Sequence, residues 1–78
     1  MDKVALGVRC KAILDDEAFV FITDRLRQQY INVAMTGTDE EALEARRQFQ
    51  ALERLRLDFA NAVTIGAETA KKRGNGTA

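Results

Sequence analysis

Hydrophobic residues recur every three or four positions through the second half of the chain, the spacing of an amphipathic α-helix. Thr38 is a favourable N-cap, and Glu41, three residues later, can complete a capping box with it. Gly74 can end the helix after a basic last turn. We therefore predict a helix over residues 38–72 and a flexible tail over residues 73–78. The stripe consists of Ala42, Ala45, Phe49, Leu52, Phe59, Val63, Gly66 and Ala70.

A second helical stripe precedes the first one and predicts a helix over residues 15–35, with Asp15 as its N-cap. Its members are Phe19, Ile22, Leu26, Tyr30 and Val33. A further apolar set lies off this stripe, which a helix with a single buried face does not need. That set either packs beneath the N-terminal segment or forms a second interface with another subunit. It comprises Val20, Phe21, Ile31 and Met35.

Residues 1–14 show a different pattern, because apolar residues alternate there with other residues as in a strand. Gly7 disfavours a helix in this segment by about 1 kcal/mol relative to alanine. The chain offers no second strand for pairing. We therefore expect an extended or partly helical N-terminal arm that lies on another surface.

The link between the two predicted helices is Thr36, Gly37 and Thr38, which is short enough to force an antiparallel arrangement. The expected fold is therefore all-α, an antiparallel two-helix hairpin with an N-terminal arm, in one small domain of residues 1–78. The second helix is the longer one, so its last turns have no partner within the hairpin. Either the arm or another chain must cover this overhang. A glycine within it, Gly66, indicates either close approach of a neighbouring backbone or a weak point in the helix.

Length and composition limit what this chain can do alone. A chain of 78 residues buries only about 60–65% of its unfolded surface, so a partner is an expected source of further stability. One cysteine and no histidine exclude an internal disulfide and the common zinc sites. The net charge of zero argues against nucleic-acid binding by the whole fold. No segment has the length of a membrane span or the pattern of a signal peptide, so we expect a soluble protein with a free thiol.

The sequence shows no constellation that would support catalysis. Two acidic clusters, at residues 15–17 and 39–41, stand at predicted helix N-termini, where capping explains them. Cys10 has no histidine to activate it and is expected to be a small packing residue. Arginines of the second helix have acidic neighbours at positions that favour surface ion pairs, such as Glu53 and Arg56. We therefore expect no enzyme, no cofactor, no metal site and no small-molecule substrate.

Four runs of packing and capping residues lie between residues 13 and 60: ILDDEAF at 13–19, RLRQQY at 25–30, EARR at 44–47 and QALERL at 50–55. In these runs the chain resembles small helical proteins encoded among the structural genes of tailed bacteriophages. The resemblance implies a virion-associated or assembly-related helical hairpin, found in the host cytoplasm during assembly and then in the virion, and it carries over no catalytic residue.

The functional prediction is a non-enzymatic structural or assembly subunit that acts through helix-mediated contacts with copies of itself or with a larger phage structural protein. The alternative is a small regulatory protein that binds nucleic acid, or a nucleic-acid enzyme, through its arginines and its basic tail at Lys71, Lys72 and Arg73. The predicted protein-interface residues are Val20, Phe21, Ile31, Leu43, Leu57, Phe59, Val63 and Ile65.

Overall fold

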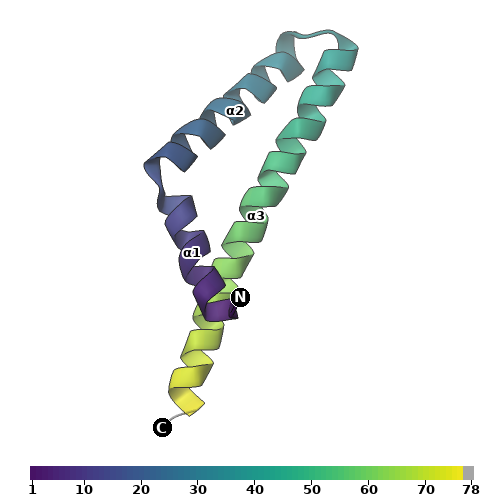
Figure 1. Cartoon of the computed structure of the whole chain (residues 1–78). Helices are drawn as coiled ribbons and strands as arrows, with labels where there is room; N and C mark the ends of the chain where they lie inside the picture. Colours follow the sequence, from purple (N-terminus) through teal and green to yellow (C-terminus); the bar gives the residue numbers. More distant parts are fainter. Residues whose placement is uncertain (77–78) are drawn as a thin grey trace.

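A computed structural model describes residues 1–76, which form three α-helices joined end to end (Figure 1). Helix α1 spans Lys3–Asp15, α2 spans Glu17–Thr36 and α3 spans Asp39–Gly76. Helices α1 and α2 follow one another along one side of the molecule, and both run antiparallel to α3. The predicted all-α class is confirmed for the described residues, but the arrangement has three helices and not two.

The N-terminal segment is a helix, so of the predicted extended or partly helical arm, the extended form is wrong and the helical form extends further than expected. Asp2 caps α1, because its carboxylate accepts a hydrogen bond of 2.7 Å from the Val4 amide. The face of α1 that meets α3 is formed by Val4, Gly7, Cys10 and Leu14. This spacing of three, three and four residues is helical. The alternating apolar residues of the sequence concealed this helical spacing. Val8, for example, is part of the alternation but does not belong to the packing face, since it is 66% exposed.

A single non-helical residue, Asp16, separates α1 from α2. Its backbone is extended, with φ of −69° and ψ of 127°, and its carboxylate accepts from the Phe19 amide at 2.9 Å. Asp16 is therefore the N-cap of α2, while Asp15, the predicted cap, is the last residue of α1. One extended residue bends the chain sharply, so α1 continues beyond α2 and does not lie beneath it (Figure 1).

The turn into α3 has the capping box that the sequence predicts. The Glu41 amide donates to the Thr38 hydroxyl at 3.2 Å, and the Thr38 amide donates to the Glu41 carboxylate at 3.0 Å. Position 37 has no room for a side chain, because a Cβ atom there would lie 2.7 Å from the Val33 carbonyl oxygen; glycine has no such atom. The other end differs from prediction, because α3 continues through Gly74 to Gly76. The remaining two residues of the predicted tail lie outside the described part of the chain.

Helix α1 packs on α3 by backbone contact. A Cβ atom at Gly7 would lie 3.0 Å from the Gly66 Cα atom, and one at Gly66 would lie 2.8 Å from the Lys3 carbonyl oxygen. Of the two interpretations of Gly66, close approach of a neighbouring backbone is therefore the one that the structure has. The contact buries Cys10, which is 5% exposed.

Helix α2 packs on the turn-proximal half of α3 through a thin seam of side chains. The rings of Phe19 and Phe59 meet edge to face at a centroid distance of 5.9 Å. Thr23 is buried, and its hydroxyl donates to the Phe19 carbonyl oxygen at 2.8 Å, so it brings no unsatisfied polar group into the seam. Closer to the turn, Ala45 is 5% exposed.

One ion pair crosses between α2 and α3 near the middle of the seam. Arg27 Nε lies 2.7 Å from Glu53 Oε1, and both atoms are shielded from solvent without a well-aligned hydrogen bond. Arg56 approaches the same carboxylate at 3.8 Å, and the Arg27 guanidinium lies 5.8 Å from the centre of the Phe49 ring. Charge and ring contact together fix the register of α2 on α3.

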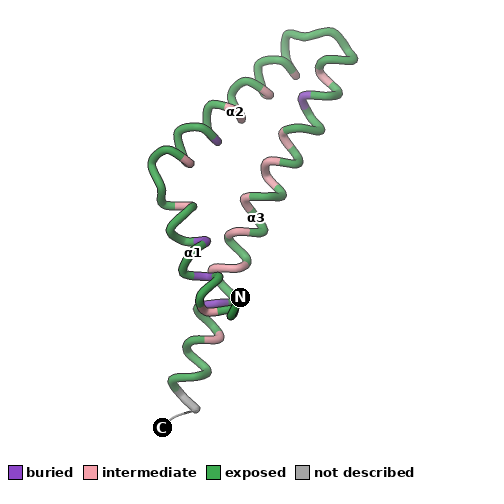
Figure 2. Tube along the Cα trace, in the orientation of Figure 1, coloured by how far each residue is buried: buried purple, intermediate pink, exposed green. Residues whose placement is uncertain are grey.

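The resulting molecule is a rod of 60 × 22 × 17 Å with a radius of gyration of 17.0 Å. A compact domain of this length would have a radius of gyration of about 11–12 Å. Figure 2 shows buried positions only at scattered points of the contact between the helices, with most of the chain exposed. The described residues therefore make a seam and not a central core.

Candidate protein-interaction surface

Large apolar side chains remain exposed on all three helices. The buried hydrophobic residues are Cys10 and Ala45, and no large side chain is fully buried in the described part of the chain. The most exposed large residues include Met35 at 79% and Phe21 at 64%. Single exposed apolar residues are common on protein surfaces, but grouped ones indicate an interaction site.

Six of the exposed aliphatic residues share one broad face of the rod, which we call the aliphatic face. Leu6 and Ile65 line one shallow groove between α1 and α3, together with Ala62. Ile13 follows Leu6 by two helical turns and Leu55 precedes Ala62 by two turns, so both lie on this side. The aliphatic face comprises Leu6, Ile13, Ile22, Val33, Leu55 and Ile65, each between 38% and 49% exposed.

The helix register places Ile22 beside Leu55 on the same face. The contacts Phe19–Phe59 and Arg27–Glu53 flank this level of the seam. Ile22 and Leu55 each lie about 140–160° around their helices from the ion pair, so they emerge on the side away from it. Val33 follows Ile22 by three turns and lines a groove there with Glu40, Glu41 and Glu44.

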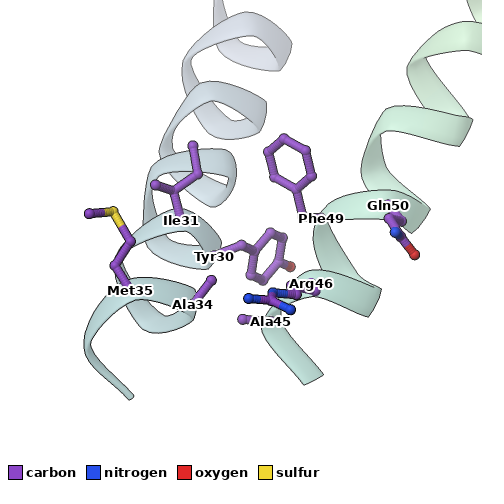
Figure 3. A pocket seen from close by; sticks show the side chains of 8 residues that line it. All are labelled: Tyr30, Ile31, Ala34, Met35, Ala45, Arg46, Phe49 and Gln50. Carbon is purple, nitrogen blue, oxygen red and sulfur yellow. The ribbon is translucent and has the colours of Figure 1, made fainter. Parts of the chain in front are cut away.

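The opposite face carries a different feature near the turn, an apolar groove of about 220 Å³. Figure 3 shows the ring of Phe49 above that of Tyr30 between α2 and α3, with Ile31 to the left of the Phe49 ring and Met35 at the outer edge. Arg46 borders the groove, and further along the same face the ion-paired Arg27 and Glu53 line a more polar hollow. The groove face is therefore apolar at the turn and charged at its middle.

The predicted interface residues divide into two groups. Phe59 and Val63, which the sequence placed on an unpartnered overhang, are half-buried, because α2 and α1 cover them. These two residues pack partly within the chain, and their predicted role in an interface stays a prediction. The others are at least 37% exposed: Val20, Phe21, Ile31, Leu43, Leu57 and Ile65.

The exposed set on α2 does not pack beneath the N-terminal segment. Val20, Phe21, Ile31 and Met35 remain exposed because α1 lies beyond the end of α2. The alternative that they form a second interface stays a prediction. They do not act together, since Ile31 and Met35 line the groove, whereas neither Val20 nor Phe21 does.

The basic end of α3 is partly neutralised. Arg73 donates to the Asp2 carboxylate at 3.0 Å, which joins the two ends of the described chain, while Lys71 and Lys72 are exposed. This contact, together with the hydrogen bond from the Val4 amide, lowers the pKa of Asp2. The Thr38 backbone and hydroxyl similarly lower the pKa of Glu41. In both cases the ionised carboxylate accepts hydrogen bonds near the start of a helix, and these bonds favour the ionised form.

The predicted ion pairs along α3 are present. Glu44 and Arg47, Arg54 and Asp58, and Glu53 and Arg56 each approach to 3.8 Å, with the first two pairs exposed and the third half-buried. Such exposed pairs contribute about 0.3–0.5 kcal/mol each, so they explain the charge pattern without a ligand.

Neither a metal-ligand cluster nor a membrane-spanning helix is found within residues 1–76. Within residues 1–76, no three Cys, Asp or Glu side chains gather where they could hold a metal ion. None of the three helices, as far as the structure describes them, has the length and apolar character needed to cross a membrane.

Comparisons with protein-family models, with curated proteins and with solved structures found no match to this chain. The resemblance to phage structural-gene products therefore stays a prediction from the sequence.

Sequence reasoning missed most of the aliphatic face. Leu6 and Ile13 stood in a segment read as extended, and Ile22 and Val33 were assigned to the stripe that packs on α3. The available signal was the seven-residue spacing of Leu6 and Ile13, which places two apolar side chains on one face only if the segment is helical.

Proposed function

We propose that this protein is a non-enzymatic assembly subunit of a bacteriophage, associated with the virion, that works by burying its exposed apolar faces against other protein chains. The observation that carries the proposal is the mismatch between a well-capped helical fold and its thin core. Each helix begins with a side-chain cap, yet the rod buries no large side chain completely. Helices stabilised mainly by tertiary packing need more burial than this seam provides.

Two surfaces with different chemistry support contact with more than one chain. The aliphatic face spans all three helices, whereas the groove between α2 and α3 offers the aromatic pair Tyr30 and Phe49 with Ile31 and Met35. An apolar groove lined by aromatic residues and methionine suits a helix from a larger protein. Copies of the chain and a larger phage structural protein are thus compatible partners, as the sequence resemblance implies.

The nucleic-acid alternative draws less support from the charges. Arg27, Arg47, Arg54, Arg56 and Arg73 each lie within 4.0 Å of a carboxylate. Lys71 and Lys72 are exposed at one end of the rod, and two lysines provide only weak, salt-sensitive attraction to phosphates.

The role in the virion is tested by quantitative mass spectrometry of gradient-purified particles of the phage that encodes the chain. We expect the protein at a fixed copy number per particle. A capsid-free assembly mixture from the same infected cells serves as the comparison. Absence of the protein from both fractions would contradict the proposal.

A further inference from the structure

We propose that the aliphatic face binds the same face of a second copy of this chain, with the two rods antiparallel and related by a two-fold axis that passes beside Leu55. This proposal rests on the proposed function, because it names one partner for an apolar face. Beyond the proposed function, it specifies which face of the chain forms the dimer, how the two copies are oriented and which residues lie opposite one another.

The surface area favours a second copy as the occupant. The chain exposes 6075 Å², whereas a folded monomeric protein of 8.7 kDa exposes about 4,700 Å². The excess of about 1,300 Å² exceeds the roughly 800 Å² that each partner buries in a standard interface, and it lies in the range of obligate homodimers. A broad, nearly flat face over three helices can bury such an area against its own copy.

The charges favour the antiparallel orientation. Residues 31–45, at the turn end of the rod, contain four acidic residues and neither lysine nor arginine. At the opposite end, residues 1–11 and 63–76 contain six basic and two acidic residues, a net charge of +4. The remaining residues have no net charge. A parallel pair would place like charges together, whereas an antiparallel pair places each acidic end beside a basic one.

These charges are close enough to act across the interface. Packed helices lie about 8–10 Å apart, which is comparable to the Debye length of about 8 Å at physiological ionic strength. The two ends of one rod are separated by most of its 60 Å length, so the attraction arises between copies and not within one.

The register follows from two grooves on the aliphatic face. One contains Ile65 together with Lys3 and Asp58, and Ile65 lies ten residues after Leu55 on α3. The other contains Val33 and Glu44, and Glu44 lies eleven residues before Leu55. Both grooves are thus about 15 Å from Leu55 along the helix. A two-fold axis at Leu55 therefore places the lysine-containing groove of one copy on the glutamate-lined groove of the other.

The composition of each face also favours this one for self-association. Around Leu55 the aliphatic face offers Ile13, Ile22 and the small residues Ala51 and Ala62, which allow close approach of a second copy. At the same level the opposite face presents the ion pair of Arg27 and Glu53. Covering that pair would remove its remaining hydration without supplying a new partner, which opposes burial.

Cysteine cross-linking tests the axis. A disulfide requires two Cα atoms within about 7 Å of each other, which a two-fold axis beside Leu55 provides for Leu55→Cys. In the same dimer, the two copies of Ile65→Cys lie about 30 Å apart and cannot react. We expect mild oxidation to convert most of Leu55→Cys, and little of Ile65→Cys, to a covalent dimer on a non-reducing gel. The unmodified chain is the background control, because Cys10 is 5% exposed.

A mixed experiment tests the orientation positively. Ile65→Cys mixed with Glu44→Cys is expected to give a hetero-linked dimer, because the axis at Leu55 places these two positions of α3 opposite each other. Self-linking of Ile65→Cys without self-linking of Leu55→Cys would overturn the antiparallel register. A monomeric unmodified protein at 100 μM would overturn the dimer itself. Neither result decides the role in the virion, which has its own test on purified particles. Circular dichroism of each variant verifies that it is folded.

Discussion

The contact between α1 and α3 depends on two residues without side chains. Gly7 and Gly66 bring the backbones of α1 and α3 together, and this approach covers Cys10 and half-buries Val63. Both glycines lie inside helices, where each costs about 1 kcal/mol relative to alanine. The packing that they permit offsets this cost only if α1 stays on α3.

Substitution of Gly66 by alanine therefore destabilises the fold, although alanine is the better helix former. Its Cβ atom would lie 2.8 Å from the Lys3 carbonyl oxygen, so α1 must move away. We expect a loss of about 1–3 kcal/mol in the free energy of unfolding, measured by urea denaturation. The matched control is Gly74→Ala, because within the described residues a Cβ atom there would meet nothing within 4 Å beyond its own stretch of helix. Equal stability of the two variants would show that the contact of α1 with α3 is not tight.

At the scale of elements, the joint at Asp16 determines where α1 lies. If this residue became helical, α1 and α2 would merge into one straight helix and α1 would leave α3. The cap formed by the Asp16 carboxylate with the Phe19 amide opposes that change.

Asp16→Ala removes the cap and favours the open arrangement, which exposes Cys10. Loss of an N-cap costs about 1 kcal/mol, so the rate of Cys10 modification by a thiol reagent is expected to rise about fivefold. Asp15→Ala is the control, since Asp15 makes only a surface ion pair with Lys11 at 2.9 Å. A similar rise in both variants would point to general destabilisation and not to the joint.

The capping box of Thr38 and Glu41 is a local signal, and it correctly predicts the start of α3. Helix α1 escaped prediction because its packing face includes Gly7, which a hydrophobic pattern does not count, and because Asp2 caps it only two residues into the chain. The ion pair of Arg27 with Glu53 joins different helices, so no spacing along the sequence could indicate it.

At the scale of the whole molecule, the rod is more extended than a chain of its length requires. Its radius of gyration of 17.0 Å and its exposed area of 6075 Å² describe an elongated subunit, and large apolar side chains form part of that exposed area. The aliphatic face could not be predicted from the sequence, because it combines residues of three helices whose relative positions depend on the bend at Asp16. Its electrostatic polarity, in contrast, is already present in the sequence as an acidic turn and two basic termini.

The molar mass of the purified protein, measured by light scattering on a sizing column at several concentrations, tests the central claim most directly. We predict a dimer of twice 8.7 kDa that Leu55→Glu converts to a monomer. Leu57→Glu, the same substitution two residues away at a position 54% exposed on the opposite face, should leave the dimer intact. A monomeric unmodified protein, or equal dissociation of both variants, would contradict the account.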